Sequence, residues 1–169
     1  YECVGLTSIS LPANIKKIDY AFYGCTSLSS VTLPTYLETI GVRAFKGCTK
    51  LKTVSIPSNV TVIGTGAFEG CTSLNSVTLS ANLLEIKGYA FYGCSSLGSI
   101  VIPAKCHTIE ACAFVGCTKL TTMTFNDSTP WQQWPTGGIL VVTNATTAAS
   151  VITGNNGAGI SYYYYKYTG

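Results

Sequence analysis

The chain has 169 residues, of which 47% are hydrophobic and 10% are charged, and its formal net charge is +3 at pH 7. This length suits one compact domain with a real core, and the scarcity of charge implies a surface of uncharged Ser, Thr and Gly residues. The Lys and Arg residues are isolated and lack the basic run that nucleic-acid binding needs. No apolar stretch approaches the roughly 18 residues that cross a bilayer, so we expect no membrane insertion of this segment.

A repeat of 23 residues organises most of the chain. An Ala-Phe pair returns at this constant spacing, a Gly-Cys pair follows it in register, and a Leu stands three residues after each Cys. The Ala-Phe pairs lie at residues 21–22, 44–45, 67–68, 90–91 and 113–114. Because one such unit cannot bury its large apolar side chains alone, successive units must stack into a solenoid.

Each unit contains the same predicted elements in the same order. Two apolar positions separated by one residue follow the Leu, which is the alternation of a strand with one buried face. Pro34, Pro57 and Pro103 end three of these strands at little cost in hydrogen bonding. A second apolar pair and the Ala-Phe pair then lead into a short helical or 3₁₀ turn. Stacking makes the strands a parallel sheet, and they are predicted at residues 31–33, 54–56, 77–79, 100–102 and 123–125.

The composition changes after residue 125, where the repeat stops. We therefore divide the chain into a solenoid of about five and a half repeats (residues 1–125) and a C-terminal α+β capping segment (residues 126–169). Within the cap the sequence predicts a strand at 139–143, a short helix at 144–152 that begins at an Asn N-cap, and a final strand at 160–167. Trp131 and Trp134 are expected to anchor this segment by packing on the last repeat.

The repeat resembles the BspA-like leucine-rich repeats, whose pattern runs approximately LxxIxLPxxLxxIGxxAFxxCxxL. The resemblance covers about residues 1–125, and Gly41 and Gly64 keep the Gly that follows the Ile. Ser80 and Asn126 depart from the strand-ending Pro, and Cys106 replaces a Leu. The resemblance implies an α/β fold, a right-handed leucine-rich-repeat solenoid with its parallel sheet on the concave face.

The family's known members are mostly surface or secreted proteins of host-associated bacteria and of some parasitic protists. They look like adhesins that bind host proteins or other cells. For this chain the resemblance implies a secreted or cell-surface location and a partner on another cell or host surface, which is a protein or a glycan. No functional residue transfers by motif.

The eight cysteines admit disulfide and metal-binding interpretations. Six of them share one repeat position and are predicted to form a buried ladder of free thiols: Cys3, Cys25, Cys48, Cys71, Cys94 and Cys117. Cys106 and Cys112 fall outside this ladder and are the one pair for which a bridge is worth testing.

His107 is the single histidine, and its neighbouring thiols suggest zinc. Tetrahedral zinc needs four converging ligands, whereas Cys117 points inward and His107 occupies an outward position. Without a second histidine there is no evident general base, and the carboxylates are scattered over unrelated positions. We therefore expect no metal, no cofactor and no enzymatic activity.

Two rows of small hydroxyl side chains are predicted on the outward side of the strands. Small β-compatible residues suit a crowded concave surface, and the alternative is an uncharged hydrogen-bonding platform for a protein segment or a glycan. The candidate binding residues are Ser30, Thr32, Thr53, Ser55, Ser76, Thr78, Ser99, Thr122 and Thr124. Val101 interrupts the row, and this argues against recognition of a regular lattice such as ice.

Four consecutive tyrosines near the C-terminus form a second candidate patch. A strand directs successive side chains to opposite faces, so two of Tyr162, Tyr163, Tyr164 and Tyr165 should be partly exposed. Together these features predict an extracellular or cell-surface protein-binding or adhesion module. The alternative is a structural spacer or assembly repeat of a larger surface protein, without a ligand of its own.

Overall fold

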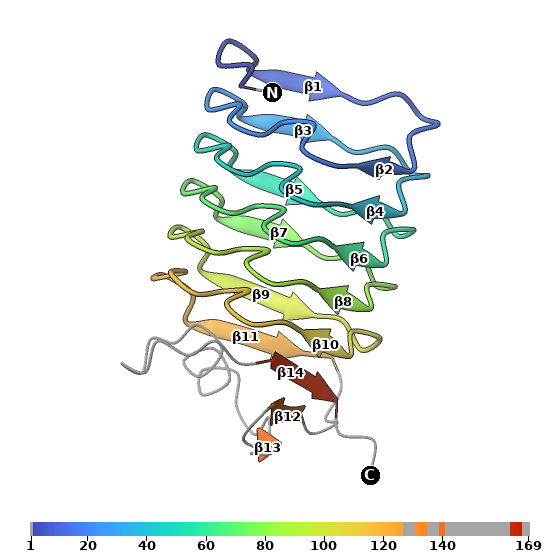
Figure 1. The fold of residues 1–169 in the computed structure, drawn as a ribbon, viewed down its shortest axis with the longest axis vertical. Coiled ribbons are helices and arrows are strands. Elements are labelled where there is room, and N and C mark those ends of the chain that lie inside the picture. The colour runs from blue at the N-terminus through green and yellow to red at the C-terminus, as the bar shows by residue number, and fades with distance from the viewer. Residues whose placement is uncertain (1, 127–130, 135–138, 141–162, 167–169) are drawn as a thin grey trace.

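The computed structural model describes residues 2–126, 131–134, 139–140 and 163–166, with side chains for residues 2–126. The repeats form a solenoid of stacked coils, and each coil contributes one longer and one two-residue strand (Figure 1). The longer strands form a first row: β1 (Ser8–Ser10), β3 (Ser30–Thr32), β5 (Thr53–Ser55), β7 (Ser76–Thr78), β9 (Ser99–Ile102) and β11 (Thr122–Phe125). The prediction of stacked parallel strands is confirmed.

The two-residue strands form a second row that the sequence did not indicate as strands. They are β2 (Lys17–Ile18), β4 (Thr39–Ile40), β6 (Val62–Ile63), β8 (Glu85–Ile86) and β10 (Thr108–Ile109). Each pairs in parallel with the next through the solenoid. The second residue of this apolar pair thus lies in a separate parallel sheet in each of these five coils.

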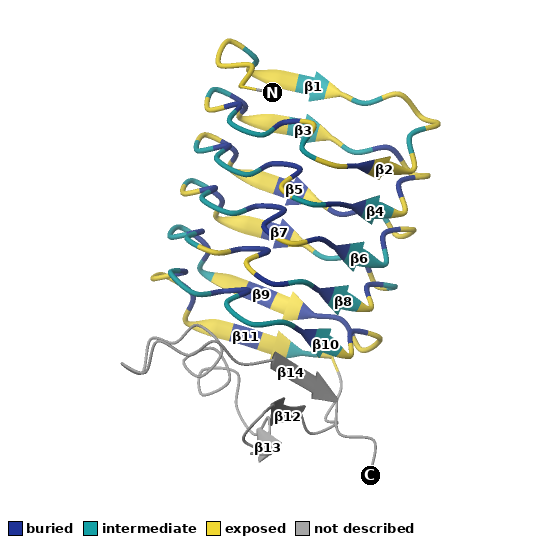
Figure 2. Ribbon diagram, in the orientation of Figure 1, coloured by how far each residue is buried: buried dark blue, intermediate teal, exposed yellow. Residues whose placement is uncertain are grey.

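A column of phenylalanines fills the centre of the coils, where Figure 2 shows the buried residues. Phe22, Phe45, Phe68, Phe91 and Phe114 stack with ring centroids 5.1–5.3 Å apart and planes within 10° of one another. This spacing is close to that of neighbouring strands, about 4.8 Å, so identical rings at one repeat position meet in the offset-stacked arrangement that aromatic pairs prefer.

The buried cysteine ladder is confirmed from Cys25 to Cys117, and none of the eight cysteines forms a disulfide. The Cys48 thiol donates to the carbonyl of Phe22 at 3.1 Å, and Cys71 donates to Phe45 in the same way. Burial raises the pKa of the Cys48 and Cys117 thiols to about 12. Each thiol thus satisfies a buried carbonyl of the preceding coil.

One expectation about cysteine is corrected. Cys3 is exposed, because it lies in the first described coil and only the following coil covers it. Cys106 is buried and Cys112 is half-buried, and no disulfide joins this pair. Position in the repeat therefore decides burial only where a coil lies on both sides.

The expected helical turns are absent: residues 2–126 contain no helix. The amides after the Ala-Phe pair alternate between two kinds of partner instead. Phe22 N–H donates to Ala44 O in the next coil at 2.8 Å, whereas Cys25 N–H donates back to Phe22 O at 3.2 Å. Because every second amide leaves the coil, separate tight turns form and the hydrogen bonds of a helix do not.

Three antiparallel strands continue the second row at its C-terminal end: β12 (Trp131–Trp134), β13 (Ile139–Leu140) and β14 (Tyr163–Lys166). β14 pairs with β10, and β12 lies between β14 and β13. β13 and β14 coincide with parts of the two strands predicted in the cap. The predicted helix at 144–152, the packing of Trp131 and Trp134, and the exposure of Tyr162–Tyr165 lie outside the described residues and side chains.

Candidate functional site

The predicted binding residues lie together on the outward side of the first row of strands. We call this surface the hydroxyl face, and all nine candidates on it are exposed. The apolar residue between each pair points inward: Val54, Val77 and Ile100 are buried. Because side chains alternate along a strand, burial of these three residues sets the hydroxyls outward. Val101, 49% exposed, adds one apolar side chain to the face.

Strand pairing on the hydroxyl face is grouped in twos, as β1–β3, β5–β7 and β9–β11. Leu11 N–H donates to Thr32 O at 3.3 Å and Ile56 N–H to Thr78 O at 2.8 Å. The corresponding amides of Leu33 and Leu79 have no hydrogen-bond acceptor within the described residues. The ladder is therefore interrupted between β3 and β5 and again between β7 and β9.

A hollow lies at each interruption. The first, about 450 Å³, is lined by residues that include Thr32, Ser55 and Pro57. The second, about 250 Å³, has Thr78, Val101 and Pro103 at the equivalent positions two repeats further on. Sequence reasoning missed both hollows, since the repeat pattern is the same at paired and interrupted strands.

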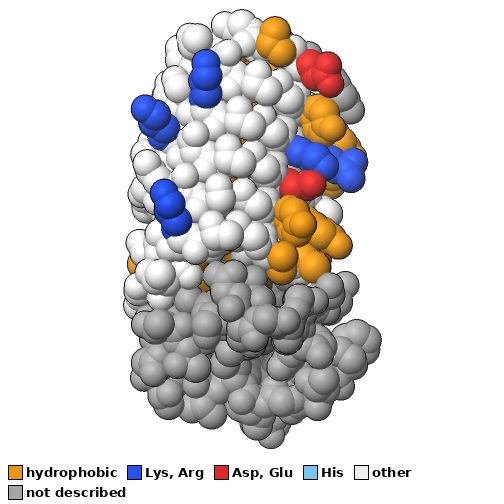
Figure 3. Space-filling model, turned by 90° about the vertical axis from the view of Figure 1, so that its left-hand side faces the viewer, with side chains coloured by type: hydrophobic (Ala, Val, Ile, Leu, Met, Phe, Trp, Pro, Cys, Tyr) orange, Lys and Arg blue, Asp and Glu red, His pale blue; other side chains and the backbone are white. Residues whose placement is uncertain are grey.

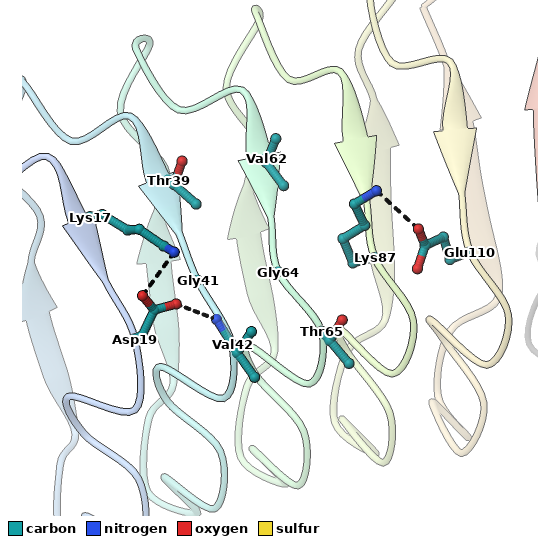
Figure 4. A pocket seen from close by; sticks show the side chains of 10 residues that line it. All are labelled: Lys17, Asp19, Thr39, Gly41, Val42, Val62, Gly64, Thr65, Lys87 and Glu110. Carbon is teal, nitrogen blue, oxygen red and sulfur yellow. Dashed lines mark hydrogen bonds and ion pairs between the residues drawn. The ribbon is translucent and has the colours of Figure 1, made fainter.

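A second hollow surface, the glycine groove, lies along the second row of strands and has a volume of about 370 Å³ (Figure 4). Gly41 and Gly64 stand side by side at its base; a Cβ on Gly64 would lie 2.7 Å from the carbonyl carbon of Gly41. The neighbouring repeats carry Asp19, Lys87 and Glu110 at the same position. Two adjacent repeats without a side chain there were the sequence signal for this groove.

The charged side chains around the glycine groove are paired with each other. Asp19 accepts a hydrogen bond from Val42 N–H and an ion pair from Lys17, both at 2.9 Å. Lys87 pairs with Glu85 at 2.8 Å and with Glu110 at 3.0 Å, and the hydrogen bond to Glu85 is the main cause of its raised pKa. Each of these charges thus has an opposite partner, and the cluster of Lys87 with Glu85 and Glu110 carries one carboxylate in excess.

Among residues 2–126, whose side chains are described, the structure brings together no set of side chains suited to a metal. His107 is exposed and its Nδ1 lies 3.0 Å from the hydroxyl of Thr108. Over the part of the chain with described side chains, no three His, Cys, Asp or Glu residues converge. In the same part, no helix has the length and apolarity needed to cross a membrane.

Comparison with known proteins agrees with the geometry. The model of the BspA type leucine rich repeat region matches residues 1–121 in six copies. No curated protein matches the chain. Among solved structures, a leucine-rich repeat protein of T. pallidum is 36% identical with a TM-score of 0.70, over 73% of this chain and 58% of its own.

A leucine rich cell surface protein of Faecalibacterium prausnitzii is 31% identical with a TM-score of 0.61, over 82% of this chain and 46% of its own. A leucine-rich repeat protein of Bacteroides ovatus is 30% identical with a TM-score of 0.56, over 73% of this chain and 38% of its own. This chain thus spans somewhat more than half the length of the T. pallidum protein and less than half the length of the other two. The family match, over most of the repeats seen in the structure, shows that the chain belongs to the BspA-type leucine-rich repeat family.

Proposed function

We propose that the chain is a recognition module of a secreted or cell-surface protein and that it binds a partner protein through the hydroxyl face. The observation that carries the proposal is the run of exposed, uncharged side chains over six stacked strands, which are hydroxyls except at Val101. The family supports the cell-surface setting, as does the similarity to a leucine rich cell surface protein. A glycan on another cell or host surface is the second partner class with the same hydrogen-bonding chemistry.

The hydroxyl face suits binding for physical reasons. Each Ser or Thr hydroxyl both donates and accepts hydrogen bonds, and such short side chains lose little freedom when a partner immobilises them. The strands beneath are held on both sides by stacked coils, so the platform is ordered before it binds. The two hollows add depth, and beside them the unpaired amides of Leu33 and Leu79 offer backbone donors.

We also propose that residues 126–169 act as a cap and that Tyr162–Tyr165 form a secondary contact patch. The pairing of β14 with β10 supports the capping role, because it covers the last edge of the second row. The proposal includes no catalytic activity. The competing function is a spacer that extends a larger surface protein, for which uncharged coils would serve equally well.

The experiment compares the chain with a variant whose hydroxyl face is charged. Thr32→Lys, Ser55→Lys and Thr78→Lys place three bulky cations across the centre of the face, next to both hollows. Immobilised protein is probed with extracellular-matrix proteins and with a glycan array. We expect the triple variant to lose at least about tenfold in affinity, since each buried contact of this kind costs about 1–3 kcal/mol.

The matched control carries the same added charge on another surface. Thr26, Thr72 and Thr118 are exposed in the turns that follow the Gly-Cys pairs. Changing these three to Lys should leave binding intact. Binding that survives the hydroxyl-face variant contradicts the proposed site, and binding found only with longer chains of several more repeats supports the spacer.

A further inference from the structure

One backbone position of the repeat is held in the left-handed region in all five coils, although only one coil has glycine there. Gly66 has φ +62°, whereas Tyr20, Arg43, Tyr89 and Cys112 at the same position have φ between 48° and 60°. Glycine adopts this conformation freely and a residue with a Cβ does not. Four coils therefore hold a side chain where the backbone favours its absence.

The position is fixed by hydrogen bonds between coils rather than by the side chains. Tyr20 N–H donates to Val42 O, Arg43 N–H donates to Thr65 O and Gly66 N–H donates to Gly88 O, each at 2.9 Å. The same bond therefore forms with tyrosine, arginine or glycine at the position. Backbone geometry does not require the larger residues, and residues held in such a conformation cluster at functional sites.

Three of these side chains, together with the residues three positions after them, form a surface that we call the turn ridge: Tyr20, Tyr23, Arg43, Lys46, Tyr89 and Tyr92. Figure 3 shows hydrophobic and charged side chains in a column along one edge of the molecule, beside a wide uncharged surface. Tyr89 and Tyr92 are 45% and 39% exposed, and their ring centroids lie 5.6 Å apart at 51°. Tyrosine and arginine are the residue types that dominate binding energy in interfaces.

The charges of the turn ridge leave one cation without an ion-pair partner. Lys46 pairs with Glu69 at 2.7 Å, and both side chains are about one-quarter exposed. Arg43 is exposed and forms no ion pair with any residue that the structure describes. Its chain lies over Gly66, where an added Cβ would come within 3.3 Å of Arg43 Cγ. The same Cβ would lie 2.9 Å from Glu69 Oε2, so the open position at Gly66 holds both the Arg43 chain and the Glu69 carboxylate that pairs with Lys46.

We propose that the turn ridge binds a proline-rich segment of a partner protein that carries an acidic residue. Arg43 takes the carboxylate, and Tyr89 with Tyr92 takes a proline. A polyproline II helix has no internal hydrogen bonds, so its carbonyls are open to side-chain donors, and it docks on exposed aromatic side chains.

The dimensions of this ligand fit the ridge. Arg43 and Tyr89 lie two repeats apart, which corresponds to about 10 Å at the strand spacing. Three residues of polyproline II span about 9 Å and return to the same side of the helix. One segment therefore reaches both groups with side chains three positions apart. This surface is separate from the hydroxyl face, and its partner need not be the one proposed above.

The test uses a fluorescein-labelled peptide with four prolines on each side of a central glutamate, measured by fluorescence polarisation. The control peptide has lysine in place of the glutamate. We expect the glutamate peptide to bind at least about tenfold more tightly, since the charge faces Arg43. Equal binding of the two peptides, or none, overturns the proposal.

Two glycine substitutions separate binding from folding. Arg43→Gly and Tyr89→Gly restore the residue that the backbone conformation favours, so each should keep the thermal unfolding midpoint at or above that of the parent. Each should also weaken binding of the glutamate peptide by at least about tenfold. A lowered midpoint, or unchanged peptide binding, contradicts the inference.

A further pair of variants keeps this test independent of the function proposed above. Arg43→Gln keeps a long polar side chain without the charge and should also lose the preference for the glutamate peptide. The variant with lysines at Thr32, Ser55 and Thr78 should bind that peptide as the parent does. Loss of peptide binding in the hydroxyl-face variant would place the peptide on the wrong surface and refute the turn ridge.

Discussion

The phenylalanine column makes a quantitative prediction about where in the solenoid stability resides. Phe68 is fully buried and stacks on Phe45 and Phe91, both at 5.3 Å. Phe22 is 7% exposed, and among the described rings it stacks on Phe45 alone, at 5.1 Å. Phe68→Leu and Phe22→Leu remove the same atoms, but the first deletes two ring pairs and the second deletes one.

The expected difference follows from the value of a ring pair. Each pair contributes about 0.5–1.5 kcal/mol beyond the burial of its area, and a more enclosed site relaxes less after truncation. Phe68→Leu should therefore lower the free energy of unfolding by about 1 kcal/mol more than Phe22→Leu does. With a urea m-value of about 2 kcal/mol per molar, the midpoints should differ by about 0.5 M.

Urea unfolding followed by far-ultraviolet circular dichroism measures this difference. Both variants should share the m-value of the parent, which shows that the same surface is exposed on unfolding. Equal midpoints for the two variants would refute the reasoning, because the number of ring pairs removed would then make no difference to the free energy of unfolding. A larger loss of unfolding free energy in Phe22→Leu would show instead that the first coil contributes most to stability.

Three further predictions concern glycine, thiol ionisation and thiol access. Gly64→Ala should destabilise the fold by about 1–3 kcal/mol in urea unfolding, because its Cβ meets the backbone of Gly41 at 2.7 Å. Gly98→Ala, whose Cβ meets nothing within 4 Å, should be neutral or slightly stabilising; equal losses would contradict the close packing of the glycine groove. Burial raises the pKa of the Cys71 thiol well above its ordinary value of 9.0. The unfolded chain therefore releases this proton first as pH rises past 9, and the free energy of unfolding falls by about 1 kcal/mol per pH unit for each such thiol. Cys71→Ala should make this decline, measured by urea titration between pH 8.5 and pH 10, shallower by one thiol. A thiol reagent at neutral pH should label exposed Cys3 fastest and buried Cys71 only on unfolding; rapid labelling of Cys71 would contradict a closed core.

The sequence alone determined the coil. A constant spacing of 23 residues forces identical positions of successive units into contact, so Phe45, Cys48 and Leu51 had to lie inside wherever a coil covers them on both sides. The same periodicity determined that Thr53 and Ser55 lie outward on either side of Val54. These inferences held because they depend on one residue type and its register.

The tertiary structure decided what depends on pairs of groups from different coils. The amide of Phe22 donates its hydrogen bond to Ala44 O of the next coil and not to an acceptor in its own coil. Tight turns therefore form in place of the expected helix. The thiol of Cys48 finds its acceptor one coil back, on Phe22. The repeat pattern is the same at every coil, so it does not distinguish these partners.

The surfaces available for binding were decided in the same way. Whether β3 pairs with β5, whether two glycines meet across coils, and whether Arg43 stays in a left-handed conformation each depend on the fit between neighbours. The antiparallel pairing of β14 with β10 brings residues 163–166 to the edge of the second row, at a strand that lies more than 50 positions earlier in the chain. The repeat pattern determines which residues of a coil are buried. The hydrogen bonds and gaps between coils form only when the coils stack, so the pattern does not predict them.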